Sequence, residues 1–269
     1  MTPTPTPTDA GAPARRVSVV TGAGSGIGAA TARALAAAGH HVVLTGRRAE
    51  LLEHVAKEIQ AADGTAASGG SAEVYPLDIT DAAAVRAFAE HVGPVDDLVN
   101  NAGGAVGAES VADADPADWR AMYEVNVLGT LRLTQALLPA LEASGRGTVL
   151  VLSSTAAFTA YEGGGGYVAA KAGAHALAAT LRLELCGRPV RVVEIAPGMV
   201  RTDEFAVNRF RGDEAKAAAV YQGVAEPLLA EDVADTVVWS LTRPQHVNVD
   251  LLVVRPRAQA AQHKIHREA

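Results

Sequence analysis

The chain has 269 residues, 49% of them hydrophobic, and a formal net charge of −7, an acidic balance that argues against a general nucleic-acid or anionic-membrane binder. One cysteine excludes an internal disulfide and a multi-cysteine metal site, and the eight histidines show no metal-ligand spacing. We therefore expect a soluble cytoplasmic protein with a sizeable core, no bound metal, and small molecules rather than nucleic acid or membrane as partners.

Residues 1–14 alternate threonine with proline, cannot form a helix and lack the apolar core of a signal peptide, so we expect a disordered tail. A chain of this length could form two domains. Residues 15–258 show no shift in composition, however, and we predict a single domain there. Residues 259–269 are expected to be a polar C-terminal tail, either disordered or covering a neighbouring subunit.

Short β-branched runs alternate with Ala- and Leu-rich stretches of helical period, which is typical of βαβ units with a parallel sheet. We predict an α/β fold: one Rossmann-type, doubly wound domain whose seven-stranded, mainly parallel sheet has helices on both faces. The longest helices are expected over about 116–143 and 167–186, and 61–73 is expected to be a surface loop. The strands are predicted at 16–20, 41–45, 72–79, 95–103, 147–154, 190–198 and 249–256.

The first predicted strand runs into the glycine-rich stretch TGAGSGIG, residues 21–28. Glycines between a strand and a helix allow the backbone to approach a pyrophosphate at the helix N-terminus. The stretch could also be no more than a tight turn, but its place in the chain favours a dinucleotide site. No Gly-Lys-Ser/Thr follows, which disfavours a P-loop nucleotidase. The cofactor-binding candidates here are Gly22, Ser25, Gly26, Ile27 and Gly28.

The end of the second predicted strand selects the cofactor. An acid at this place usually binds the ribose 2′-hydroxyl of NAD, whereas an arginine accommodates the 2′-phosphate of NADP. This chain has Gly46 there, followed by Arg47 and Arg48. The two arginines could instead be solvated or pair with Glu50 and Glu53. The absence of the acid and the presence of two cations both indicate NADP.

Tyr167 and Lys171 are four residues apart on one predicted helix and so share a face. A phenol has a pKa near 10 and is a poor base at neutral pH, but a nearby ammonium, together with an oxidised nicotinamide, lowers that pKa. Ser154, at the end of the fifth predicted strand, could hold a substrate oxygen while Tyr167 transfers the proton. By itself the Tyr–Lys spacing is also common on surface helices.

Six motifs now come together in one order: TGAGSGIG, NNAG (100–103), VNVLG (125–129), SS (153–154), YVAAK (167–171) and PGMVRT (197–202). With them the chain resembles the short-chain dehydrogenase/reductase family across residues 17–202. The resemblance implies that Tyr167 is the general acid/base, that Lys171 lowers its pKa and holds the nicotinamide ribose, and that Ser154 orients the substrate oxygen. It also implies that Asn126 holds a water in the proton relay. From the residues alone, Asn126 could equally mark a helix kink or a buried amide.

The same resemblance assigns further cofactor contacts. Asp78 and Ile79 match positions beside the adenine, although Asp78 could also cap the next helix in competition with Asp81. Asn101 and Gly103 match the NNAG positions near the cofactor. The loop that covers the nicotinamide is matched by Pro197, Gly198 and Thr202. The family is commonly tetrameric through its two long helices, so a homotetramer is expected.

The last third of the chain contains EF (204–205), RFRGD (209–213), HVN (246–248), Pro256 and Gln259. With these residues it resembles the branch of NADP-dependent 3-hydroxy acid dehydrogenases that act on serine and allo-threonine. A guanidinium can grip a carboxylate, so Arg209 or Arg211 could bind the acid, unless both are solvated or contact another subunit. The leading prediction is hydride transfer between NADP(H) and a secondary alcohol or ketone, leaning to small 3-hydroxy acids. The alternatives are a reductase of bulkier ketones or aldehydes in secondary metabolism and a non-catalytic NADP-binding regulator.

Overall fold

The computed structural model describes residues 15–268, and the predicted Thr/Pro tail (1–14) lies outside them. The central sheet has seven strands in the order β3-β2-β1-β4-β5-β6-β9, and all of its pairings are parallel. The predicted α/β doubly wound fold is therefore confirmed. The strands are β1 (Val17–Thr21), β2 (His41–Gly46), β3 (Ser71–Pro76), β4 (Asp97–Asn100), β5 (Gly147–Leu152), β6 (Val190–Pro197) and β9 (Leu252–Val254).

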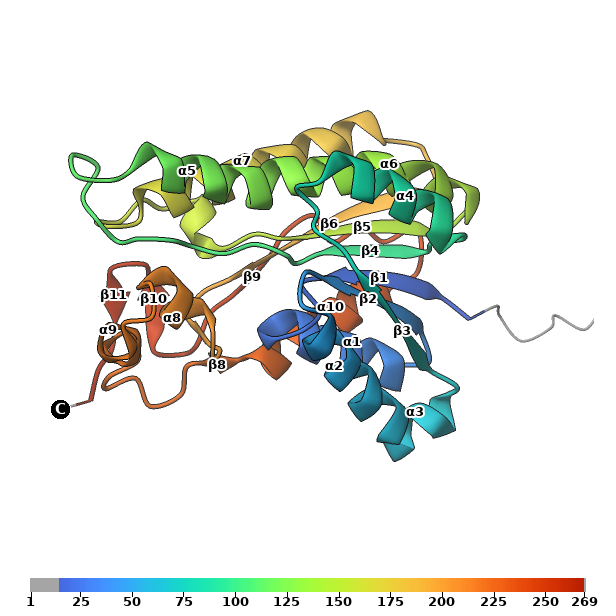
Figure 1. Ribbon diagram of the computed structural model, residues 1–269, viewed down its shortest axis with the longest axis horizontal. Coiled ribbons are helices and arrows are strands. Elements are labelled where there is room, and N and C mark those ends of the chain that lie inside the picture. The colour runs from blue at the N-terminus through green and yellow to red at the C-terminus, as the bar shows by residue number, and fades with distance from the viewer. Residues whose placement is uncertain (1–14, 269) are drawn as a thin grey trace, which may run out of the picture.

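Helices cover both faces of this sheet (Figure 1). One layer contains α1 (Gly26–Ala37), α2 (Ala49–Ala61) and α10 (Ala230–Leu241). The other contains α4 (Ala82–Val92), α5 (Pro116–Tyr123), α6 (Thr130–Ala143) and α7 (Gly165–Glu184). A separate apolar cluster fills the space on each side, since successive side chains of a strand point to opposite faces. Among residues 15–268, no helix is long and apolar enough to cross a bilayer.

Smaller elements gather at the end of the molecule opposite the entry of the chain into β1 (Figure 1). They are the helices α8 (Phe205–Arg209) and α9 (Glu214–Ala219), the short pair β7 (Val200–Arg201) and β8 (Leu228–Leu229), and the hairpin β10 (Gln259–Ala261) with β11 (Lys264–Ile265). Residues 259–268, expected to be a tail, thus form a hairpin and a short extension. Arg267 donates to the carbonyls of Val220 and Gln222, which ties this extension to the turn after α9.

The predicted helix over 116–143 is continuous but changes its winding in the middle. Residues Glu124–Gly129 form a π-helical segment between α5 and α6. The Nδ2 group of Asn126 donates to the carbonyl of Met122 at 2.8 Å, the acceptor that the Asn126 N–H would use in a regular α-helix. The side chain therefore competes with the backbone ladder, and the helix widens at this place.

Two further expectations differ from the structure. The Gly/Ser-rich stretch 61–73 was expected to be a loop, but it contains the short helix α3 (Asp63–Ser68), which ends at Gly69 in the left-handed conformation. The last strand of the sheet covers only Leu252–Val254 of the predicted 249–256, because its pairing with β6 involves just three residues.

The glycine-rich turn after β1 depends on close approach of the backbone. A Cβ atom on Gly28 would lie 2.2 Å from the carbonyl oxygen of Gly22 and 2.5 Å from Nδ2 of Asn101. That Nδ2 group donates to the carbonyl of Thr21 at 2.7 Å, so it cannot move away without losing the bond. Asn101, which the sequence placed near a cofactor, thus also clamps the turn.

We expect Gly28→Ala to destabilise the fold, because the added methyl group overlaps backbone atoms. Overpacking of this kind costs about 1–3 kcal/mol, and each kcal/mol lowers the midpoint of thermal unfolding by roughly 2–4 °C in a domain of this size. Gly64→Ala is the matched control, because nothing lies within 4 Å of its added Cβ. Equal unfolding midpoints for the two variants, measured by circular dichroism, would contradict the close packing of this turn.

Candidate active site

A cavity of about 680 Å³ opens at the carboxyl ends of the strands. It lies where the strand order reverses between β1 and β4, the place at which open α/β sheets bind their ligands. Its wall runs from the glycine-rich turn, past the ends of β4, β5 and β6, to α8 and the β10–β11 hairpin. Ser154, Tyr167 and Lys171 all line it, so the structure brings together three candidates that the sequence placed on separate elements.

Lys171 fixes the relation between α7 and β5. Its side chain is buried, and its ammonium group donates to the carbonyl of Leu152, the last residue of β5, at 2.9 Å. The ring of Tyr167 lies one turn earlier on α7, with its centroid 5.9 Å from Lys171 Nζ. Ser154, the second residue after β5, lies close enough to the phenol of Tyr167 to lower its pKa. The lysine therefore holds the tyrosine over the serine.

Burial dominates the protonation of both groups on α7. It raises the pKa of Tyr167 to about 12, although the hydrogen bond with Ser154 opposes the shift. It lowers the pKa of Lys171 to about 8, against the attraction of the Glu194 carboxylate. The expected lowering of the tyrosine pKa by Lys171 is therefore not met by the chain alone, since the ammonium bonds to the Leu152 carbonyl and burial of the phenol outweighs the influences that lower its pKa.

Asn126 and Gly103 complete the polar group around Lys171. Asn126 is 2% exposed, and its Nδ2 group donates to the carbonyls of Met122 and Gly104. Its Oδ1 atom has no partner among the described residues. A Cβ atom on Gly103 would lie 2.4 Å from that oxygen and 3.5 Å from Lys171 Nζ, so only glycine fits between them. Asn126 is thus both a buried amide and the centre of the helix irregularity.

The other half of the cavity has the shape and lining that a dinucleotide requires. The residues predicted around the glycine-rich turn surround the N-terminus of α1, where backbone N–H groups favour an anion. Asp78 accepts from the N–H and hydroxyl groups of Thr80, while Asp81 caps α4. Asp78 is therefore not the helix cap. The predicted contacts that line the cavity are Gly22, Ser25, Gly26, Ile27, Gly28, Arg47, Arg48, Asp78, Ile79, Asn101, Gly103, Pro197, Gly198 and Thr202.

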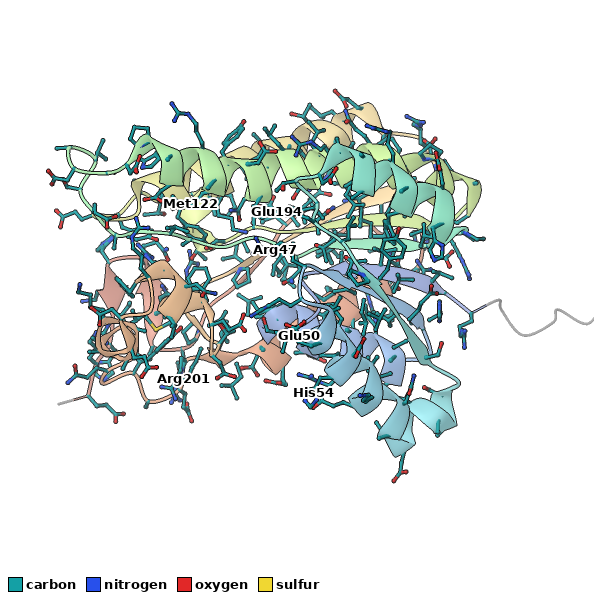
Figure 2. All side chains as sticks on the ribbon, in the orientation of Figure 1. Arg47, Glu50, His54, Met122, Glu194 and Arg201 are labelled. Carbon is teal, nitrogen blue, oxygen red and sulfur yellow. The ribbon has the colours of Figure 1, made fainter. Side chains whose placement is uncertain are left out.

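The two arginines after β2 have different surroundings. Arg48 makes a bidentate pair with Glu204, with nitrogen–oxygen distances of 2.6 and 2.8 Å, and Ser25 donates to the same carboxylate at 2.9 Å. The alternative pairing of these arginines with Glu50 or Glu53 is not observed. Arg47, which precedes α2 (Figure 2), makes no hydrogen bond or ion pair with the described residues. It is exposed at the rim of the cavity and free to bind a phosphate.

Arg209 and Arg211 are also separated by the structure. Arg211 is exposed, lies outside the cavity lining and pairs with Asp118. Arg209 is half-buried in the cavity wall, donating to the hydroxyl of Tyr161 at 3.0 Å and to the carbonyl of Gly163 at 2.9 Å. It has no carboxylate partner among the described residues, and its Nε group is buried without an acceptor. The cavity thus contains a cation without a counter-ion.

Several side chains that line or support the site were not predicted from the sequence. Glu204 and Gln259 belong to motifs that indicated the branch, yet nothing local to them shows that they meet the cavity. Tyr161 and Gln262 had no sequence signal at all. Glu194 is 1% exposed behind Lys171, where it contacts Ser153 and His175 at 2.5 and 2.8 Å. All these contacts join segments far apart in the chain.

The arrangement can transfer a proton to or from an oxygen held by Ser154 and Tyr167, beside a cleft that fits a dinucleotide. The phenol, the serine hydroxyl and the lysine ammonium are close enough to act together. Within residues 15–268, no group of three or more His, Cys, Asp or Glu side chains is placed to hold a metal ion.

Known proteins resemble this chain in sequence and in fold. Residues 16–211 match the short chain dehydrogenase family. An uncharacterized oxidoreductase of Mycobacterium tuberculosis is 54% identical over 227 residues, which cover 84% of this chain and 85% of that protein. The NADP-dependent 3-hydroxy acid dehydrogenase of Escherichia coli K12 is 36% identical over 235 residues, 86% of this chain and 91% of that protein. The closed form of serine dehydrogenase complexed with NADP⁺ has a TM-score of 0.84 at 35% identity, covering 94% of this chain and 100% of that one.

Proposed function

The chain belongs to the short-chain dehydrogenase family, and we propose that it interconverts small 3-hydroxy acids and the corresponding 3-oxo acids. Family and relatives make it an oxidoreductase that acts on CH–OH groups with NADP as cofactor. The proposal adds the class of substrate. It is consistent with the names of two similar proteins, a 3-hydroxy acid dehydrogenase and a serine dehydrogenase.

Arg209 is the observation that carries this proposal. A guanidinium has five N–H donors, and only two of them are used by Tyr161 and Gly163. A half-buried cation without a counter-ion is unfavourable, and an anionic ligand removes that cost. Arg209 lies close enough to Tyr167 to influence its ionisation. An acid bound to Arg209 therefore places its hydroxyl carbon near the tyrosine.

We propose the following roles for the residues that surround the reacting carbon. Tyr167 gives a proton to the carbonyl oxygen during reduction and removes it during oxidation, and Ser154 holds that oxygen by a hydrogen bond. Lys171 fixes Tyr167 and holds the ribose. Asn126 presents its unpartnered Oδ1 atom to the relay behind the lysine. The bound NADP(H) supplies the hydride chemistry.

The cofactor contacts are proposed to divide between the two arginines. Arg47 binds the 2′-phosphate, because it is the one of the pair that has no protein partner in the described residues. Arg48 holds the segment that begins at Glu204 over the glycine-rich turn. Asp78 and Ile79, which line the cavity, contact the adenine in this proposal, and Thr202 contacts the carboxamide. The remaining turn and loop positions contact the pyrophosphate and nicotinamide through their backbone.

A homotetramer and a cytoplasmic location remain predictions. Exposed apolar side chains near the long helices support self-association: Leu183 on α7 is 79% exposed and Tyr123 on α5 is 43% exposed. Large apolar groups of this kind gain from being covered by a partner. The single cysteine supports the reducing compartment.

The pKa of Tyr167, raised to about 12, predicts different pH profiles for reduction and oxidation. Reduction uses the protonated phenol, which is fully present at neutral pH, so kcat/KM for the 3-oxo acid should stay level from pH 6 to 8. Oxidation uses the phenolate, whose fraction rises about tenfold per pH unit below the pKa. Initial rates of NADPH oxidation and NADP⁺ reduction test this, and a level oxidation profile over the same range would contradict it.

The Tyr167→Phe variant should lose about 10²–10⁴-fold of its activity in both directions, while its affinity for NADPH stays unchanged.

The free state of Arg47 predicts that it controls cofactor choice. Arg47→Ala should raise the KM for NADPH by about 10–100-fold, the value of a lost charge-assisted hydrogen bond, while the KM for NADH changes little. Lys57→Ala is the matched control, because it removes an equal charge from the exposed side of α2. A similar loss for both cofactors in Arg47→Ala would show that the residue does not recognise the 2′-phosphate.

The proposed substrate class is tested by comparing 3-hydroxybutyrate, 3-hydroxyisobutyrate, L-serine and L-allo-threonine with 2-butanol, which has no carboxylate. We expect the wild-type protein to prefer at least one acid strongly. Arg209→Ala should lower kcat/KM for that acid by about 100-fold and change the rate with 2-butanol only about two- to threefold. Arg211→Ala, which lies outside the cavity, should leave both unchanged. Equal rates with 2-butanol and the acids in wild-type protein would overturn the proposal.

A further inference from the structure

The C-terminal hairpin closes the substrate end of the cavity. Gln259, Gln262 and Ile265 belong to its lining, although they lie more than fifty residues beyond the loop that follows β6. The hairpin is held in place by its own pairing, Gln259 with Ile265 and Ala261 with Lys264. It is held to the loop after β6 by a bond from the Met199 N–H to Gln259 Oε1 at 2.8 Å. Its side chains are therefore fixed parts of the site.

The hydrogen bonds of the neighbouring residues determine the orientation of the Gln262 carboxamide. The N–H of Met199 can only donate, so it identifies the Oε1 atom of Gln259 and leaves Nε2 of that residue as a donor. This Nε2 group donates to Oε1 of Gln262 at 3.1 Å, and the Thr155 hydroxyl donates to the same oxygen at 2.7 Å. The Oε1 atom of Gln262 is thus occupied from two sides. Its Nε2 group has no partner among the described residues and is a free donor.

The position of this donor relates it to the reacting group. Thr155, to which Gln262 is bonded, directly follows Ser154, the residue that holds the substrate oxygen. The Gln262 side chain is half-buried and belongs to the cavity lining. The side of the cavity next to Ser154 is thus lined by a residue with an unused N–H₂ group, which can donate hydrogen bonds to a substituent near the hydroxyl carbon and cannot accept them.

The charged side chains around this end of the cavity also disfavour a positively charged substituent. Among the described residues, three carboxylates line the cavity: Asp78, Asp203 and Glu204. Asp78 lies after β3 and is bonded to Thr80, Glu204 is bonded to Arg48, and Asp203 directly precedes Glu204. The substrate end instead presents Arg209 and the Gln262 donor. A positively charged substituent at this end would lie in a part of the cavity where neither α8 nor the hairpin contributes a carboxylate to the lining.

We infer that Gln262 selects the substituent at C2 of the substrate: it binds an oxygen acceptor and disfavours an ammonium group. The inference rests on the proposed function and narrows it, from 3-hydroxy acids in general to those without a 2-amino group. Acids with a 2-hydroxyl group fit the free donor, whereas 2-amino-3-hydroxy acids place their ammonium against it.

Serine and glycerate form a matched pair, because they differ only in the ammonium or hydroxyl group at C2. Both enantiomers of each are compared as substrates of the full-length protein with NADP⁺ near neutral pH. We expect kcat/KM for glycerate to exceed that for serine by about tenfold or more. Gln262→Glu keeps the acceptor oxygen for Thr155 and Gln259 but replaces the free donor by a carboxylate oxygen, so the ratio should fall by about tenfold or more toward serine.

His263→Glu is the control, since it adds a negative charge to the same hairpin at an exposed position outside the cavity lining. It should leave the ratio within about twofold, and the KM for NADP⁺ should be unchanged in both variants. A wild-type preference for serine, or a ratio that Gln262→Glu and His263→Glu shift equally, would overturn the inference. The inference would also be overturned if the protein oxidised 3-hydroxybutyrate but accepted neither glycerate nor serine. Failure of the proposed function gives a different result from failure of this inference: the activity with 2-butanol would exceed the activity with every acid.

Discussion

The bond between the Lys171 ammonium and the Leu152 carbonyl is the contact on which the rest of the site depends. It joins the buried face of α7 to the carboxyl end of β5, and both residues are buried apart from a small surface on the cavity. A buried ammonium without an acceptor is unfavourable, so the helix is held at one position and rotation over the sheet. Tyr167, one turn away, and Ser154, two residues beyond Leu152, are thereby brought together in the cavity lining. The site is built by this constraint more than by the shape of either element.

The structure makes room around that lysine by two departures from regular packing. Asn126 takes a carbonyl from the backbone of its own helix and widens the helix into a π-helical segment. Gly103 lets the backbone after β4 approach both Asn126 and Lys171 more closely than any side chain would allow. Both features interrupt regular packing and make room for the polar groups of Asn126 and Lys171 inside an apolar layer. Such local irregularity at the centre of a site is typical of proteins whose stability is supplied elsewhere in the core.

The substrate end and the cofactor end of the cavity differ in which side-chain donors have no partner among the described residues. At the cofactor end, Arg48 is already satisfied by Glu204 and Arg47 is not. At the substrate end, Arg209 has no carboxylate partner in the described residues, and the amide donor of Gln262 has no acceptor. Of these donors, Nε of Arg209 is buried, and a buried polar group without a partner is rare unless a ligand supplies one. Each of them indicates a negatively charged or oxygen-bearing ligand.

The sequence alone predicted the fold class, the main strands and helices of the sheet and its two layers, and Ser154, Tyr167 and Lys171 as candidates that the structure brings into one cavity. These depend on local patterns: hydrophobic period, glycines at strand ends, residues one helical turn apart and short motifs in a fixed order. It could not decide between Arg47 and Arg48 or between Arg209 and Arg211, since each pair is adjacent or nearly so in the chain. Their difference comes from partners such as Glu204, which is 156 residues from Arg48. Gln262 met Thr155 only through a contact across 107 residues, and the raised pKa of Tyr167 followed from burial that no local pattern records. Tertiary structure decided these points because charge pairing, hydrogen-bond direction and desolvation depend on which distant segments pack together.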